Sequence, residues 1–220
     1  MNVLTRGGAS TERLTGRHGY VEVCGLAPGA ALPAGAADTE SAVVVLAGTL
    51  SGLDRGASLF LAVGEPSDLV AGPEGARLLL VRARGGGRSP TVGSRSDDVD
   101  HVSSAVLTAG GGFTDMRVRW LVSGADPGST RLVVATSTFA PDGHHELHRH
   151  SNAEEFFMVL DGGGEHLTET DAVRLGPGDV VLVEAGEWHG YRTDSGVTTT
   201  TVYGYLGAAS LDEAGYEVRS

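Results

Sequence analysis

The sequence predicts an all-β protein, and three observations support this fold class. Of the 220 residues, 34 are glycine, and because they follow no Gly-X-Y period they indicate a large number of turns. Short runs rich in Val, Leu, Thr, Phe and Tyr recur between Gly, Pro, Asp or Asn residues, as in sandwiches and barrels. No stretch keeps the apolar spacing of an amphipathic helix.

The expected strands all combine β-branched or aromatic residues with turn signals at their ends. The dipeptide Asp161-Gly162 and the Gly-Pro-Gly-Asp segment at 176–179 are examples of such signals. Residues 210–217 are expected to form one or two helical turns. In chain order, the expected strands are residues 20–24, 42–46, 58–63, 77–82, 116–122, 132–139, 155–160, 180–184 and 198–205.

A polar, glycine-rich break divides the chain and indicates two domains. At roughly 150 residues per domain the length corresponds to about one and a half domains, so each would be small. We expect a first domain at residues 1–84, a linker at 85–112 and a second domain at 113–220. Three segments of the first half resemble segments of the second in the same order, which indicates a duplication. The pairs are 26–29 with 139–143, 43–48 with 156–162, and 60–67 with 182–189.

The composition excludes several classes of function. Sixteen cationic and 28 anionic side chains give a net charge of −12, which argues against nucleic acid as a partner. All sixteen cations are arginine, which excludes a lysine nucleophile, a Schiff base and a P-loop lysine. The apolar runs are too short for a membrane span, and residues 1–13 lack the apolar core of a signal peptide. Cys24 is the only cysteine, so we expect a cytoplasmic protein with a buried, inert thiol.

Histidine is the residue type that points to a function. The chain has eight histidines, and six of them lie between residues 144 and 189. His148 and His150 are two residues apart, so on a strand their imidazoles share one face, about 7 Å apart. A carboxylate follows at Glu154 or Glu155, and His189 reaches this group only if the sheet closes into a barrel. Burying such a cluster without a cation is costly, so the sequence predicts a divalent metal site.

The spacing of these residues resembles the cupin superfamily. The resemblance covers residues 130–207 strongly and residues 17–83 weakly, and it departs from the family pattern at two places. Four residues rather than five separate Gly143 from His148, and Glu184 stands where the family has a proline. The residues that carry the two motifs are Gly143, His148, His150, Glu155 and Gly162, then Gly178, Asp179, Gly186 and His189.

The resemblance implies a fold of two tandem cupin domains, which are β-barrels of the jelly-roll type. It implies that His148, His150, Glu155 and His189 hold one metal ion, and that the chain forms a homodimer. Glu155 is preferred over Glu154 because its spacing of six residues to the next motif glycine matches the family. The parity of the strand then turns Glu154 outward, where it would hold a ligand histidine from behind.

The first half lacks the ligands. Ser67 stands at the position that matches His189, and residues 34–41, which match 148–155, contain no histidine. We therefore expect residues 1–84 to be a degenerate cupin domain without metal. Its favoured role is to stabilise the second domain by covering a sheet, and the alternative is that it shapes the mouth of the pocket.

Strand parity also selects candidates for the substrate pocket. Phe157, Val159 and Tyr191 share the parity of the ligands on their own strands, and Tyr203 joins them from the last strand. These four are expected to line the pocket, with Tyr191 placing a hydroxyl near the substrate.

Parity further suggests which groups could transfer protons. His144 and Glu146 share the parity of His148, so with Tyr191 they are the expected catalytic residues. His145 and His166 are expected at the surface, and Trp188 is expected to point away from the metal.

Three imidazoles and one carboxylate leave one or two open positions on an octahedral ion. This ligand set suits Fe(II), Mn(II), Ni(II), Co(II) or Zn(II), and we favour Fe(II). The favoured function is an Fe(II)-dependent oxygenase or dioxygenase that uses O₂ and a small oxygenated or aromatic molecule. One alternative is an O₂-independent metal-dependent isomerase, cyclase or lyase. The other is a non-catalytic cupin that binds a small molecule.

Overall fold

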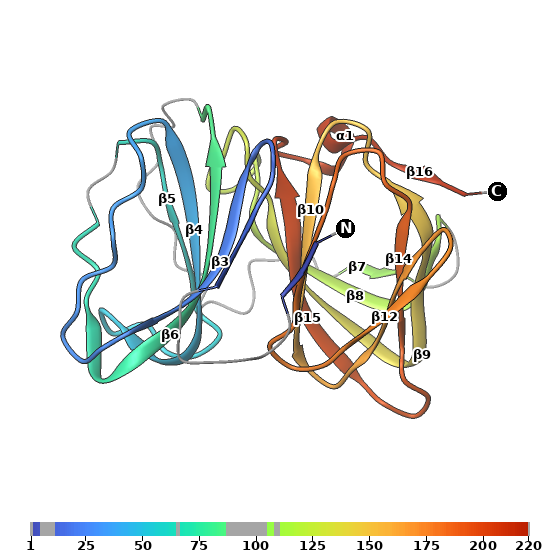
Figure 1. Cartoon of the computed structure of the whole chain (residues 1–220), viewed down its shortest axis with the longest axis horizontal. Helices are drawn as coiled ribbons and strands as arrows, with labels where there is room; N and C mark the ends of the chain where they lie inside the picture. Colours follow the sequence, from blue (N-terminus) through green and yellow to red (C-terminus); the bar gives the residue numbers. More distant parts are fainter. Residues whose placement is uncertain (1, 5–11, 65–66, 87–104, 108–110, 220) are drawn as a thin grey trace.

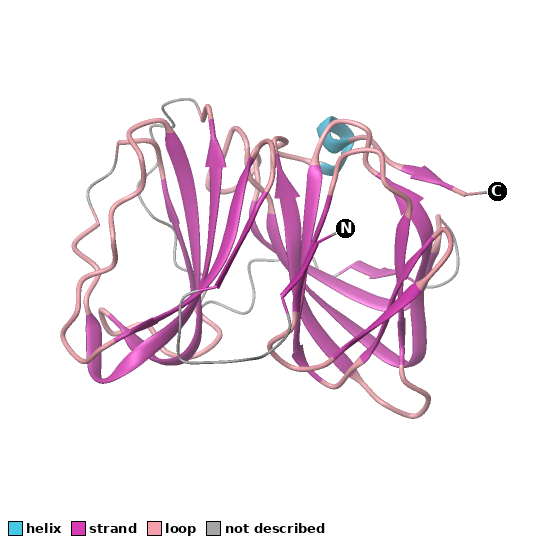
Figure 2. Ribbon diagram, viewed as in Figure 1, coloured by secondary structure: helices cyan, strands magenta, loops and turns pink. Residues whose placement is uncertain are grey.

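The chain forms two β-sheets that lie side by side. The structure is a computed structural model, and it describes residues 2–4, 12–64, 67–86, 105–107 and 111–219. One sheet is built from the first part of the chain and the other mainly from the second part (Figure 1). Strands dominate both, and α1 (Leu211–Ala214) is the one helix in the described ranges (Figure 2). This confirms the all-β prediction. No helix within these ranges is long and apolar enough to cross a membrane.

The first sheet has five antiparallel strands in the order β2-β3-β6-β4-β5. Its longest strands are rich in Val, Leu and Ala, which suits a surface packed on both faces. The bounds are β2 (Glu12–Thr15), β3 (Gly19–Leu26), β4 (Thr39–Leu50), β5 (Ser58–Leu61) and β6 (Ala71–Arg84).

The second sheet has eleven strands and curls into a barrel (Figure 1). Its main path runs β1-β13-β10-β15-β9-β14-β11-β12, while β8 and β16 also pair with β9, and β7 pairs with β8. The bounds are β1 (Asn2–Leu4), β7 (Ala105–Leu107), β8 (Phe113–Val122), β9 (Val134–Arg149), β10 (Glu154–Asp161), β11 (Gly164–Thr168), β12 (Ala172–Leu175), β13 (Val180–Val183), β14 (His189–Thr193), β15 (Thr199–Leu206) and β16 (Glu217–Val218).

All nine expected strands are present, and the expected C-terminal helical turn is α1. The main differences concern β9, which continues from the expected strand end at residue 139 as far as Arg149, and strands outside the expected set such as β2, β11, β12 and β14. These four are short and mix polar with apolar residues, so their pairing partners rather than their own composition make them strands.

Two short strands belong to the second sheet although they lie outside the expected second domain at residues 113–220. Asn2–Leu4, which falls in the predicted first domain, pairs with β13 of the second sheet. Ala105–Leu107, which falls in the predicted linker at 85–112, pairs with β8. Residues 87–104 of that linker lie outside the described residues.

The two sheets repeat one arrangement of strands. The order β5-β4-β6-β3 in the first sheet has the same antiparallel neighbours as β13-β10-β15-β9 in the second. The register agrees as well, since Ser41 lies opposite Arg82 and Leu61 just as Glu155 lies opposite Tyr205 and Val183. This correspondence supports the expected duplication, and it matches Ser41 with Glu155.

A shared apolar core joins the two sheets. On β10, Phe156 and Met158 face the same cluster of buried side chains as Val21, Val44 and Leu79 of the first sheet. The alternate residues of β10 face a separate cluster inside the barrel. The first sheet therefore covers one outer face of the barrel.

Polar contacts across this interface overturn the expectation for Glu154. The Glu154 side chain is 2% exposed, and its carboxylate accepts hydrogen bonds from the backbone N–H groups of Arg17 (2.5 Å) and His18 (2.8 Å). It does not hold a ligand histidine, because the outer face of β10 meets the first sheet and not the barrel interior. The outward direction of Glu154 was predicted correctly, but the contact of that outer face with the first sheet was not.

Glu40, at the matching position of the first sheet, makes the reciprocal contact. This fully buried carboxylate accepts bonds from Ser129 Oγ (2.8 Å), Thr130 Oγ1 (2.6 Å) and the N–H groups of Thr130 (2.9 Å) and Arg131 (3.0 Å). Each half thus contributes one buried glutamate that binds a segment of the other half. Glu154 binds the residues before β3, and Glu40 binds the residues before β9.

Cys24 is confirmed as a buried free thiol. Burial raises its pKa to about 11, so the thiol stays protonated and unreactive at neutral pH.

Candidate metal centre

The four predicted ligands meet inside the barrel. His148 lies near the end of β9, and His150 is the first residue after that strand. Glu155 is the second residue of β10, and His189 is the first residue of β14. Each offers one ligand atom, and these atoms all lie within 4.8 Å of one another. All four side chains are buried. His189 lies directly opposite His148 in the antiparallel pairing of β14 with β9, so closure of the barrel brings the distant ligand into place.

Backbone carbonyls fix the orientation of all three imidazoles. The Nδ1 atoms of His148, His150 and His189 lie 2.9, 2.6 and 3.0 Å from the carbonyl oxygens of Glu146, Gly215 and Glu187, respectively. A carbonyl can only accept, so each Nδ1 carries the proton. In a neutral imidazole the Nε2 atom is then a lone pair, and each Nε2 faces the cluster.

The inward-facing atoms have no protein partner that satisfies them. All three Nε2 atoms are buried without a hydrogen bond, and they lie 3.8, 3.0 and 3.3 Å from Oε2 of Glu155 for His148, His150 and His189. Three lone pairs and a carboxylate that converge on one point repel one another unless a cation lies between them. The cluster therefore fits a divalent metal ion.

The electrostatics favour the metal-binding protonation states. Burial lowers the pKa of His148 to about 4, so this imidazole is neutral at neutral pH. Burial opposes ionisation of Glu155, but the imidazoles, His189 first, outweigh it and hold the pKa of Glu155 well below its usual value. Burial lowers the pKa of His189, but the Glu155 carboxylate outweighs it and raises that pKa above its usual value, so a bound cation would displace the proton that His189 shares with Glu155.

A β-bulge in β9 overturns the assignment of His144, Glu146 and His145. His148 lies opposite His189 and His145 opposite Tyr191, so three steps on β9 face two steps on β14. The extra residue reverses the alternation, and the Glu146 side chain is exposed. His144 is partly exposed, and its Nδ1 lies 3.4 Å from the carbonyl oxygen of Asp142.

His145 takes the inner position instead. His145 is half-buried, and its ring stacks on that of His148 with centroids 3.6 Å apart, so it contacts a ligand and only part of its side chain lies at the expected surface. The contribution of Glu146 is its carbonyl, which holds His148 Nδ1. No pattern in the sequence marks this bulge, because it depends on the pairing with β14.

His166 is also buried, contrary to the expected surface position. It is 1% exposed, and its Nδ1 has no hydrogen-bond partner. Its ring lies parallel to that of His189 at 5.9 Å and near that of Phe157 at 5.6 Å. Burial lowers its pKa to about 3. His166 lies on the inward face of β11, where buried and half-buried residues alternate over the first residues. Because β11 has five residues, its alternation does not stand out in the sequence.

The predicted pocket residues all point into the barrel. Phe157, Val159, Tyr191 and Tyr203 are buried members of one core cluster. The ring of Tyr191 packs 4.8 Å from Phe157. Its hydroxyl lies beside Gly164, where an added Cβ would come within 2.6 Å of it.

This position carries the Tyr191 hydroxyl away from the ligands. His189 pairs with Thr168 at the opposite end of β11 from Gly164, and four residues along a strand span about 13 Å. The structure therefore places the ring of Tyr191, and not its hydroxyl, toward the cluster.

Tyr205 is a neighbour of the ligand cluster that lies outside the predicted set of pocket residues. It lies opposite Glu155 on the adjacent strand, and its ring is 4.6 Å from that of His150. Tyr203 shares the same inward face, 6.3 Å from Tyr205. Burial raises the pKa of Tyr205 well above its usual value.

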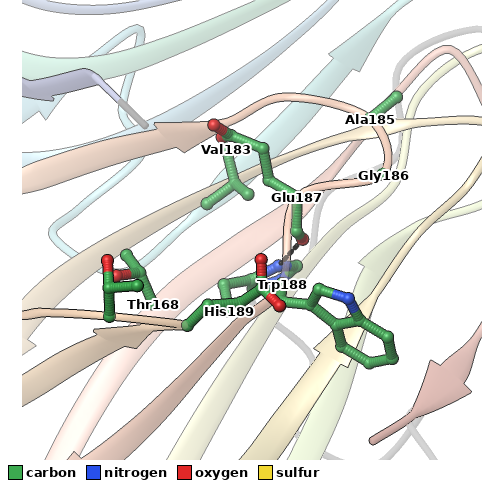
Figure 3. Close-up of a pocket in the computed structure, with 9 residues that line it drawn as sticks. Thr168, Val183, Ala185, Gly186, Glu187, Trp188 and His189 are labelled. Atoms are coloured by element: carbon green, nitrogen blue, oxygen red, sulfur yellow. Dashed lines mark hydrogen bonds between the residues drawn. The ribbon is translucent and has the colours of Figure 1, made fainter.

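A surface cavity of about 630 Å³ adjoins the His189 side of the site. In Figure 3, the Trp188 side chain extends away from His189 and toward the outside. Trp188 lies under the guanidinium of Arg149, 4.7 Å from the ring centroid, so the expectation that it points away from the metal agrees with the structure. The cavity is lined by Thr168, Glu169, Thr170, Val183, Ala185, Gly186, Glu187, Trp188 and His189.

Comparisons with known proteins agree with this fold and site. Residues 135–203 match the family described as the cupin domain. This segment contains all four ligands and supports a relationship with the cupin superfamily. None of the curated proteins matches the sequence.

Several solved structures share the fold across both halves of the chain. The Lactobacillus farciminis oxalate decarboxylase formate complex aligns over 99% of this chain and 86% of its own, with 12% identity and a TM-score of 0.71. Protein Ylba from E. coli aligns over 89% and 81%, with 13% identity and a TM-score of 0.68. A Bacillus subtilis oxalate decarboxylase structure with Mn(II) centres aligns over 94% and 77%, with 14% identity and a TM-score of 0.60. At these identities the likeness shows the fold alone, and the fold is that of tandem cupin domains.

Proposed function

We propose that this chain is a metal-dependent cupin enzyme whose single divalent ion is held by His148, His150, Glu155 and His189. The observation that carries the proposal is the convergence of three unsatisfied Nε2 atoms on the Glu155 carboxylate. The bound ion would leave one or two positions for exogenous ligands and would supply Lewis-acid or redox chemistry there. The first domain, which has Ser41 in place of Glu155, is proposed to be a degenerate cupin domain that stabilises the second.

The reaction proposed first is oxygenation of a small oxygenated or aromatic molecule with Fe(II) and O₂. The proton-bearing groups beside the ligands, Tyr205 and His166, have pKa values far above and far below neutrality because both are buried. Efficient acid–base catalysts have pKa values near the working pH, so neither is suited to move protons in a redox-neutral reaction. Phe157 and Tyr203 give the barrel interior an aromatic lining that excludes water.

A redox-neutral lyase reaction is the second candidate. Oxalate decarboxylases share the fold over most of this chain, and one of those structures concerns Mn(II) centres. Mn(II) is among the ions that the ligand set accommodates. The substrate of this candidate would be a small carboxylate.

Metal analysis and oxygen consumption separate the two candidates. The protein is purified without metal, reloaded separately with Fe(II) and Mn(II), and offered small aromatic diols, hydroxy acids and dicarboxylates. Turnover that consumes O₂ in step with substrate and stops under anaerobic conditions supports the oxygenase. Full turnover without O₂ contradicts it and supports the lyase. His144→Ala serves as a control, because His144 lies on the same strand as His148 but outside the cluster.

A further inference from the structure

The C-terminal residues lie against the back of the metal ligands. We name residues 210–219 the C-terminal strap; it contains α1 and β16, and β16 pairs with the ligand-bearing end of β9. In Figure 1 the strap lies at one end of the barrel. In its register Val218 lies opposite His148 and Glu217 opposite Arg149. Two residues of the strap therefore pair with the end of β9 that carries His148.

The most direct contact is made by Gly215. Its carbonyl oxygen lies 2.6 Å from Nδ1 of His150 and accepts a hydrogen bond from the Nδ1–H group. Of the three carbonyls that orient the ligand imidazoles, those of Glu146 and Glu187 come from residues two positions before their histidines. The one that orients His150 comes from 65 residues away, so His150 depends on the strap for its orientation.

Tyr216 makes a second contact, which acts through His145. Its hydroxyl donates to the carbonyl of Gly111 (2.5 Å) and accepts from Nε2 of His145 (3.0 Å). His145 in turn stacks on His148 at 3.6 Å. The Tyr216 ring itself lies 5.4 Å from the ring of His148 and 5.9 Å from that of His150.

The strap is anchored where it meets the ligands. Ala214 is fully buried, and its carbonyl accepts from the N–H of Asn152 at 2.9 Å. The far end pairs with β9 through β16, and the N–H of Arg219 donates to the carbonyl of Leu147 at 2.9 Å. The exposed ion pairs of Arg149 with Glu217 and of Arg219 with Glu169 add little to this. The strap is thus held against the ligand-bearing end of β9 along its length.

We propose that the C-terminal strap is a positioning element of the metal centre, in which Gly215 sets the orientation of His150 and Tyr216 supports His148 through His145. This inference rests on the metal binding proposed above. Groups that hold ligand imidazoles from behind typically change metal affinity about 10- to 100-fold. By linkage, a bound ion stabilises the strap by the same factor by which the strap strengthens binding.

Two substitutions test the strap without touching a ligand. Gly215→Ala places a Cβ 2.5 Å from Ser151 Oγ at a φ of +76°, so the segment and its carbonyl must shift. Tyr216→Phe keeps the ring and removes both hydrogen bonds. Glu217→Gln is the matched control, because the side chain of this exposed neighbour forms its ion pair with Arg149, outside the ligand cluster.

The measurements are the Kd of the full-length protein for Mn(II), from the EPR signal of the free ion, and the visible spectrum of the Co(II) form. We expect Kd to rise about 10- to 100-fold in Gly215→Ala and several-fold in Tyr216→Phe, with an altered Co(II) spectrum in both and no change in Glu217→Gln. Unchanged Kd and spectra in both variants would overturn the proposal, even if their melting temperatures fell. Failure of the wild type to bind either ion would instead overturn the metal centre itself.

Discussion

The two halves of the molecule place different chemistry at matching positions. In the second half, Glu155 lies opposite Tyr205 and joins three imidazoles. In the first half, Ser41 and Arg82 occupy the matching pair. The strand order and the register are shared, so the scaffold alone does not determine whether a metal site forms.

Arg82 provides a covalently attached cation in the first half. It is 5% exposed, its guanidinium donates to the Tyr20 hydroxyl (2.8 Å) and the Ala34 carbonyl (3.3 Å), and it also bonds to the carbonyl of Pro33. Residues 34–41 match the ligand loop 148–155. In the first half, a buried arginine that binds backbone carbonyls thus stands where the second half has the cluster that fits a divalent ion.

The largest effect is expected where the second half loses its ligands. His148→Ala or His189→Ala removes one of the four convergent ligands, and metal content measured by elemental analysis should fall from about one ion per chain to near zero. His144→Ala should retain the ion. Retention of a full equivalent by both ligand variants would show that the metal lies elsewhere.

The reciprocal glutamates allow the two halves to be compared at the interface. Glu40→Gln leaves an amide facing four donor contacts and should lower the free energy of unfolding by about 2–3 kcal/mol. Glu154→Gln meets two backbone donors and should cost about 1–2 kcal/mol. Urea denaturation measures both. Equal effects, or a larger one at Glu154, would contradict the view that the number of buried donors sets the cost.

A substitution of Arg82 tests whether its guanidinium takes, in the first half, the place that a metal ion would take in the second. Arg82→Met leaves two carbonyls and a hydroxyl without their donor and should cost about 1–2 kcal/mol, since the loop at 33–38 is exposed and water can reach part of it. Metal content should not change. Adding Ser41→Glu to the wild type should not create a second metal site, because no histidine lies in residues 34–41; a second bound equivalent would refute the comparison.

The pH dependence of the metal-free protein tests the buried histidines of the second half. His148 and His166 have pKa values lowered from 6.5 to about 4 and about 3 by burial. The unfolded chain takes up protons at these groups below about pH 6.5 while the folded chain does not, so stability should be complete above that pH and fall as the pH drops toward 3. His166→Phe should flatten this decline in denaturation curves at successive pH values. An unchanged slope would show that His166 is not buried and neutral.

The candidate ligands could be predicted because their signal is local. The i, i+2 spacing of His148 and His150 and the parity of Glu155 need only strand geometry. The neighbours of the site could not be predicted in this way. His145 reaches the inner face through a bulge that depends on β14, and His166 is buried because the barrel closes over a short strand.

The sequence by itself determined the fold class, the duplicated order of strands and the four residues of the cluster, because alternation, turn residues and ligand spacing act over a few positions. Only the tertiary structure decided that Glu154 and Glu40 clamp the two halves together, that Tyr191 turns its hydroxyl away from the cluster, and that Gly215 and Tyr216 lie behind the ligands. The contacts of the glutamates, Gly215 and Tyr216 join residues 65 to 137 positions apart, and the Tyr191 hydroxyl meets Gly164 of another strand. Contacts of this kind arise from packing and leave no local pattern to read.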